Sequence, residues 1–92
     1  MYDIKERVIY LRQASGRSSS GFSVAAGLSR SAVRLIEVGT RGQPETATLL
    51  AICRVTGANL DWLASGTGDP PNESDVRETI DRLAPLESGA AE

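Results

Sequence analysis

Three hydrogen-bonding side chains are spaced within residues 30–34 so that they lie together on the outer side of a helix. Arg30, Ser31 and Arg34 occupy positions i, i+1 and i+4, and residues four apart are neighbours on a helix surface. A guanidinium group can donate two hydrogen bonds to a guanine, and a serine hydroxyl can bond a base or a phosphate with little preference. The chemistry predicted for this stretch is hydrogen bonding to a nucleic acid.

These side chains belong to the second of two short helical patterns separated by a turn. The first pattern covers residues 19–26, with Ser18 as its expected N-cap. Gly27 can adopt the left-handed conformation that ends a helix. Ser29 is then the expected N-cap of the second helix, which is predicted over residues 29–38. Two short helices joined by a glycine-containing turn form a helix-turn-helix, whose second helix enters the major groove of DNA.

The other segments predict further helices and no strand. Asp3 and Glu6 have the spacing of a capping box at the start of the chain, and Pro44 suits the first turn of a later helix. Asn59 is a suitable N-cap, whereas Lys5 and Arg7 are expected to be ordinary surface or salt-bridge residues. The predicted helices cover residues 3–14, 44–56, 60–64 and 75–83. Glycines are expected to end four of the helices, at Gly16, Gly39, Gly57 and Gly66.

The last predicted helix has a narrow apolar stripe made by Val76, Ile80 and Leu83. Such a stripe either folds back on the domain or pairs with a partner chain, and the pattern leaves both alternatives open. Either Asn72 or Ser74 can cap this helix. The predicted organisation is a domain over residues 1–66, a linker over 67–74, a C-terminal helix over 75–84 and a disordered tail over 85–92.

The composition argues against an enzyme. The chain of 92 residues has no histidine and one cysteine, so imidazole catalysis, an internal disulfide and a cysteine metal cluster are not expected. Cys53 is interpreted as a small buried apolar residue. No cofactor or small-molecule ligand is evident, and no apolar run has the length of a membrane span. We expect a cytoplasmic protein.

The charges are unevenly distributed along the chain. The net charge is −2, which is unusual for a nucleic-acid-binding protein. However, Lys and Arg outnumber Asp and Glu in residues 1–45, and the reverse holds in residues 46–92. A basic half that contains the helix-turn-helix fits contact with phosphates.

The ordered set of motifs resembles the Cro/CI-type helix-turn-helix family, which includes phage repressors and small bacterial regulators. The resemblance covers roughly residues 4–66, and the turn and second helix carry much of it. Its most specific elements are Gly27-Leu28-Ser29-Arg30-Ser31, then Val33, Ile36-Glu37 and Gly39, and finally Asn59-Leu60-Asp61-Trp62-Leu63 with Gly66. The fold it implies is an all-α, five-helix, repressor-like domain, to which the C-terminal helix is an addition.

The resemblance also implies roles for individual residues. Double-stranded DNA is the implied partner, bound by a homodimer. The implied structural ion pair joins Arg12 to Glu37. The implied base contacts are Arg30, Ser31, Arg34 and Leu35, and the implied phosphate contacts are Arg17, Ser18, Ser19, Thr40, Arg41 and Gln43. Val76, Ile80 and Leu83 are the candidate dimerisation residues.

Several residues depart from the pattern of the family. Gly21, Ser23 and Val24 replace helix-favouring or alanine residues, and two further departures bear on DNA contact. Ser19 stands where glutamine is common, and its short hydroxyl can reach only a phosphate. Leu35 stands where a polar base-reading side chain is common. Leucine cannot hydrogen-bond a base edge, but it can contact a thymine methyl group.

Two functions compete at this stage. The first is a sequence-specific DNA-binding transcriptional regulator, interpreted as a repressor that occupies an operator as a homodimer. The second is a protein-interaction module on the same fold, such as an antitoxin or a regulatory partner. DNA binding falls steeply with salt concentration, so salt dependence separates the two.

Overall fold

The computed structural model describes residues 3–39 and 43–85, and these residues form six α-helices and no strand. The fold is therefore all-α, as the sequence predicts. The helices are α1 (Ile4–Ser15), α2 (Ser19–Ala25), α3 (Ala32–Val38), α4 (Thr46–Thr56), α5 (Leu60–Ser65) and α6 (Glu73–Leu83).

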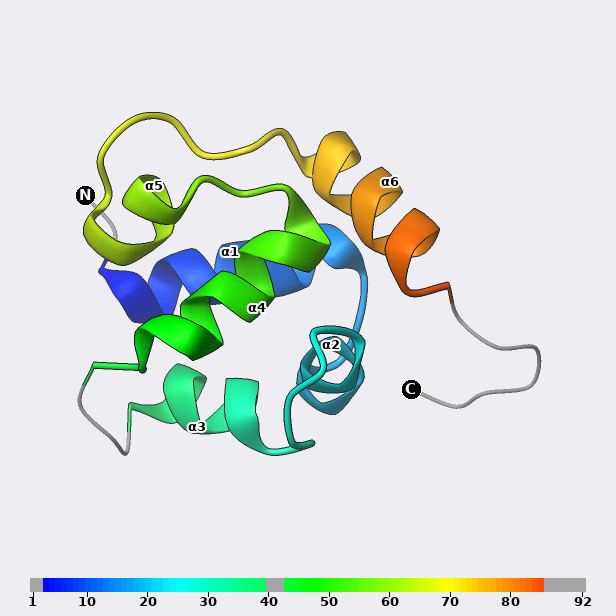
Figure 1. Cartoon of the computed structure of the whole chain (residues 1–92), viewed down its shortest axis with the longest axis horizontal. Helices are drawn as coiled ribbons and strands as arrows, with labels where there is room; N and C mark the ends of the chain where they lie inside the picture. The colour runs from blue at the N-terminus through cyan, green and yellow to red at the C-terminus, as the bar shows by residue number, and fades with distance from the viewer. Residues whose placement is uncertain (1–2, 40–42, 86–92) are drawn as a thin grey trace.

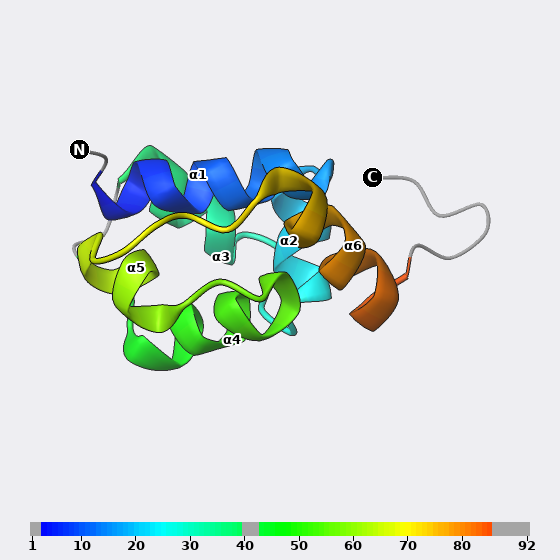
Figure 2. The ribbon, with the colours of Figure 1, turned by 90° about the horizontal axis from the view of Figure 1, so that it is seen from above.

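The arrangement leaves α2 and α3 along one edge of the molecule, as Figure 1 shows. The view turned by 90° places α1 and α4 on opposite sides, with α6 at the end of the molecule (Figure 2). Helix α6 packs against both α1 and α4, and α3 packs against α1 and α2. Helix α1 thus packs against both helices of the helix-turn-helix.

Local capping determines where most of the helices begin and end. The Asp3 carboxylate accepts a hydrogen bond from the Glu6 backbone, and Glu6 accepts one from the Asp3 backbone, which completes the predicted capping box. Asn59 accepts from Asp61 and Trp62 at the start of α5. The four predicted glycines all follow helix ends with positive φ, from 71° at Gly39 to 81° at Gly66.

The start of α4 differs from the prediction. Helix α4 begins at Thr46 with Glu45 as its N-cap, so Pro44 precedes the helix instead of lying in its first turn. The proline ring fixes φ at a value that suits a residue just before a helix as well as one in the first helical turn. The sequence pattern therefore does not distinguish the two placements.

Each of the six helices contributes at least one fully buried apolar side chain to a single core. These side chains are Val8 and Leu11 from α1, Phe22 from α2, Val33 from α3, Ile52 from α4, Leu63 from α5, and Val76 and Ile80 from α6. A small domain is marginal when its core is incomplete. The two α6 side chains therefore belong to the folding unit of the helix-turn-helix.

This burial corrects the assignment of Val76 and Ile80 to a dimer interface. Both side chains are 0 % exposed within a single chain, whereas Leu83 is 54 % exposed. The apolar stripe folds back on α1 and α4. Helix α6 begins at Glu73, two residues earlier than predicted, and Asn72 is its cap. The predicted tail, apart from Pro85, lies outside the described residues.

Arg7 is buried, contrary to its predicted place on the surface. Its side chain donates from Nε to the Leu63 carbonyl at 2.9 Å and from a terminal nitrogen to the Ala64 carbonyl at 3.2 Å. The last carbonyls of a helix lack partners within the helix, so Arg7 fastens the end of α5 to α1. The periodicity of α1 gives no sign of this, because Leu63 and Ala64 are more than 50 residues away.

Tyr10 and Trp62 fix the segment that leads to α6. Their rings meet edge-on with centroids 6.0 Å apart, and the Tyr10 hydroxyl donates to the Pro71 carbonyl at 2.6 Å. Burial, and secondly the Glu73 carboxylate, raise the pKa of Tyr10. The hydroxyl therefore keeps the proton that it donates.

Cys53 lies half-buried on α4 as a free thiol. Burial raises the pKa of this thiol, so the reactive thiolate is disfavoured at neutral pH. None of the helices in the described ranges has the length and apolar character needed to cross a membrane.

Candidate nucleic-acid interface

The turn between α2 and α3 is longer than predicted. Gly27 has φ 78°, and the Leu28 N–H closes the end of α2 by donating to the Ser23 carbonyl at 2.9 Å. Helix α3 begins at Ala32, so the predicted start at Ser29 is wrong. Ser29 instead uses its carbonyl, which accepts from the Ala32 N–H at 3.1 Å. Arg30 and Ser31 therefore lie in the turn that leads into α3.

Ser23 takes over the capping role that Ser29 was expected to play. The N-cap of α3 is Ser31, whose side chain makes no capping bond. The buried Ser23 hydroxyl accepts from the Val33 N–H at 3.0 Å and donates to the Ser19 carbonyl at 2.8 Å. The backbone N–H of Val33 has no acceptor within α3, and a side chain of α2 thus accepts its hydrogen bond. This tertiary cap fixes the orientation of the two helices relative to each other.

The base-contact residues predicted from the sequence lie at the start of α3 and along it. Arg30, Ser31 and Arg34 are exposed, and Leu35 is half-buried. Across residues 3–39 and 43–85, no carboxylate lies within ion-pair distance of Arg30 or Arg34. Two arginines with no acidic neighbour present uncompensated positive charge at the start of this helix.

A polar cluster holds α3 against α1 and α2. The Arg12 guanidinium pairs with the Glu37 carboxylate at 2.5 Å, and the Ser19 hydroxyl donates to the other Glu37 oxygen at 3.1 Å. This is the ion pair that the family resemblance implies. The side chains of Arg12 and Glu37 remain 22 % and 13 % exposed, so the pair is only partly buried.

The residues assigned to phosphate contact have different environments. The Ser18 hydroxyl caps α2 by accepting from the Gly21 N–H at 3.1 Å, and the Ser19 hydroxyl is bound to Glu37. Both serines are half-buried, and Gln43 is exposed. Thr40 and Arg41 lie outside the described residues.

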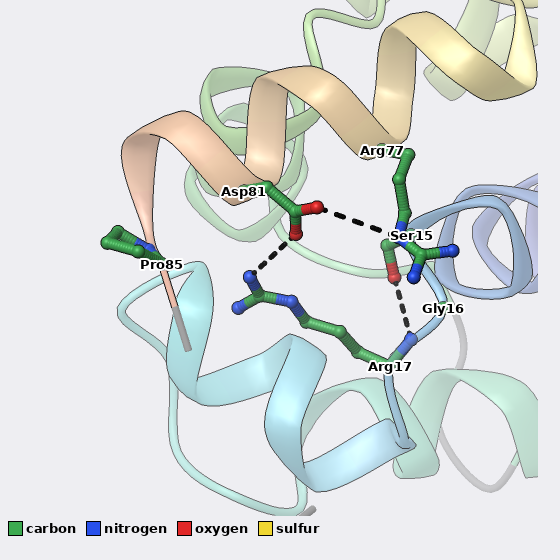
Figure 3. Close-up of a pocket in the computed structure, with 6 residues that line it drawn as sticks. All are labelled: Ser15, Gly16, Arg17, Arg77, Asp81 and Pro85. Carbon is green, nitrogen blue, oxygen red and sulfur yellow. Dashed lines mark hydrogen bonds and ion pairs between the residues drawn. The ribbon is translucent and has the colours of Figure 1, made fainter. Parts of the chain in front are cut away.

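Arg17 is not available to a phosphate, which corrects its predicted role. Its side chain is 4 % exposed, and one terminal nitrogen donates to Asp81 at 3.2 Å and to the Ala84 carbonyl at 2.6 Å. Figure 3 shows this side chain turned toward α6, beside a cavity of about 240 Å³. Its Nε atom is buried and has no hydrogen-bond partner among the described residues. Arg17 therefore fastens the turn before α2 to the end of α6.

Asp81 also contacts a second arginine, Arg77, so that Arg17, Asp81 and Arg77 form a cluster. Its other carboxylate oxygen lies 3.6 Å from Nε of Arg77, one helical turn away. A Cβ atom built on Gly16 would stand 2.8 Å from an Arg77 nitrogen, so the glycine allows the guanidinium to lie close to the end of α1. The cluster is a structural junction between α1, α2 and α6.

Asp81→Asn is expected to lower the free energy of unfolding by about 1–2 kcal/mol, because the buried Arg17 cation loses its carboxylate partner. The loss is smaller than for a fully buried pair, because the Asp81 side chain is half exposed and solvent screens its charge. Urea denaturation measures the loss. The control is Glu78→Gln, which removes an exposed carboxylate from the same helix. Equal stabilities for the two variants would contradict the structural role of the Arg17–Asp81 pair.

One comparison with known proteins identifies a family for this chain. A helix-turn-helix family model matches residues 8–63, which is more than half of the chain. No match is found among curated proteins or among solved structures. The matched range contains the Ser23 cap, the Arg12–Glu37 pair and α3. The chain belongs to the helix-turn-helix family of the Cro/CI type, a family of DNA-binding regulators.

Proposed function

We propose that the chain is a sequence-specific transcriptional repressor that occupies an operator as a homodimer, with α3 in the major groove. The observation that carries this proposal is a pair of exposed arginines, Arg30 in the turn before α3 and Arg34 on α3 itself. Ser23, Arg12 and Glu37 hold this helix in place. A rigid helix with unpaired guanidinium groups at its start is suited to direct readout of guanine.

Each proposed contact follows from the chemistry of its side chain. Arg30 reads a guanine through two hydrogen bonds, and Ser31 and Arg34 bond to bases or to the adjacent backbone. The Ser18 and Ser19 hydroxyls are occupied by Gly21 and Glu37, so at the start of α2 the backbone N–H groups bind phosphate. Gln43, after α3, binds a further phosphate. Thr40 and Arg41 are assigned to phosphates by the family resemblance.

The dimer is proposed because one recognition helix covers little DNA. Helix α3 has seven residues, which corresponds to a length of roughly 10 Å. Two copies with their α3 helices about 34 Å apart would read successive turns of the major groove. Repression then requires only that the protein occupies the operator. With a single cysteine, the chain suits a reducing compartment, and the protein would act in the cytoplasm.

Selection of bound sequences from a random pool of duplex DNA tests this function. We expect the purified protein to enrich an inverted repeat that contains guanines, with an affinity that falls steeply as salt is raised. A single short site would contradict the dimer but not the DNA-binding function. Absence of enrichment at low salt would favour the protein-interaction module, for which the exposed Val24 and Val38 would be the first residues to examine.

A further inference from the structure

The cavity beside Arg17 is lined by more positive than negative charge. It has a volume of about 240 Å³ and lies between the end of α1 and α6. Figure 3 shows Arg77 reaching it from α6 and Arg17 from the turn before α2, with Asp81 joined to both. Two guanidinium groups and one carboxylate give the described lining residues a net charge of +1. The cavity therefore favours an anion.

Arg17 has a hydrogen-bond donor that the described chain does not use. One of its terminal nitrogens donates to Asp81 and to the Ala84 carbonyl. Its Nε–H is buried and has no acceptor among the described residues, in a side chain that is 4 % exposed. A buried N–H without an acceptor is costly, and such a group indicates a bound water or ion.

Arg77 supplies further donors on the exposed side of the cavity. Its Nε lies 3.6 Å from Asp81, and within the described ranges no hydrogen bond engages its two terminal nitrogens. The Arg77 side chain is 61 % exposed, so it can move aside to admit a ligand to the buried Nε of Arg17. The two arginines thus offer donors from opposite sides of one cavity.

We propose that this cavity binds a small organic carboxylate, whose oxygens accept from Nε of Arg17 and from the terminal nitrogens of Arg77. Hydrogen bonds between a guanidinium and a carboxylate are short and strong because both partners are charged. A monoanion matches the net charge of the lining, whereas a phosphate dianion would place a second negative charge beside Asp81. Pockets for drug-sized ligands begin at about 300 Å³, so this cavity suits an acid of a few carbon atoms.

The site goes beyond the proposed function, because none of its lining residues belongs to α3. A bound carboxylate would add a second link between α6 and the turn before α2, next to the Arg17–Asp81 pair. A ligand that binds only the folded chain stabilises it by mass action. The sequence does not reveal the site, because Arg17 and Asp81 are 64 residues apart.

The test titrates butyrate into the full chain labelled with nitrogen-15, while potassium chloride keeps the ionic strength constant. NMR spectra report arginine Nε–H groups as well as backbone N–H groups. We expect saturable shifts at the Nε–H of Arg17 and at the N–H of Gly16, both of which lie at the cavity. Butyramide, which has the same size and no charge, should not produce them. Inorganic phosphate is titrated in a separate arm.

Two variants locate the bound carboxylate. Arg77→Gln should weaken butyrate binding by about tenfold, because a hydrogen bond between charged groups is lost. The matched control is Arg82→Gln, which removes an equal charge from an exposed position of α6 that does not line the cavity. It should leave the affinity unchanged. Urea denaturation without butyrate establishes that both variants fold.

The possible results separate this site from DNA binding, which none of these measurements involves. An Nε–H signal of Arg17 that does not respond to butyrate would identify water as its partner and overturn the proposal. Equal weakening by Arg77→Gln and Arg82→Gln would reduce the effect to general attraction by a basic surface. Saturable binding of phosphate without binding of butyrate would show that the ligand class is wrong.

Discussion

Arg30→Ala should weaken binding to the selected operator by roughly tenfold to a hundredfold, because the two hydrogen bonds from the guanidinium to guanine are lost. Binding to random duplex DNA should fall much less, since there Arg30 supplies only its charge. Fluorescence anisotropy at fixed salt concentration measures both affinities.

The control for this result is Arg54→Ala, which removes an equal charge from an exposed position on α4. Its effect should be small on both duplexes. Equal losses on operator and random DNA for Arg30→Ala would reduce Arg30 to a phosphate contact. In that case Arg34 would become the first candidate for guanine readout.

Ile80→Ala should lower the free energy of unfolding by about 2–5 kcal/mol, because a fully buried side chain of the single-chain core is truncated. Leu83→Ala, three residues later on the exposed side of α6, should change it by less than about 0.5 kcal/mol. Urea denaturation at two widely separated protein concentrations gives both values. If Ile80→Ala prevents folding, Ile80→Val should still lose about 0.5–1.5 kcal/mol.

The dependence on protein concentration shows whether α6 packs in the core of a single chain or between two chains. A core helix loses the same free energy at every concentration. If instead the loss shrank or vanished on dilution, Ile80 would lie between two chains, and the fold-back of α6 would be wrong.

Local signals in the sequence are sufficient to predict most of the helices. The Asp3–Glu6 box, the Asn59 cap and the glycines at helix ends act within a few residues of each other, so spacing along the chain reveals them. The predicted Ser29 cap is wrong because the hydroxyl that bonds the first turn of α3 belongs to Ser23, in the preceding helix.

Long-range pairings account for the remaining errors. The phosphate contact that the resemblance implies for Arg17 is wrong because the partners of its side chain, Asp81 and Ala84, lie more than 60 residues away in the sequence. The Val76–Ile80 stripe predicts an apolar face and does not specify what covers it. The base-contact assignments, by contrast, fall on side chains that are exposed or half-buried in the fold, and they remain predictions until DNA binding is measured.

The position of α6 near the end of the chain determines when, during synthesis, the protein can become active. Helix α6 is the last of the described helices to leave the ribosome, yet Val76 and Ile80 complete the core behind the helix-turn-helix. The contacts between α1 and α6 span most of the chain, so they cannot form before α6 has been made. A nascent chain that already contains α2 and α3 should therefore not hold α3 in its DNA-binding orientation until α6 has been made.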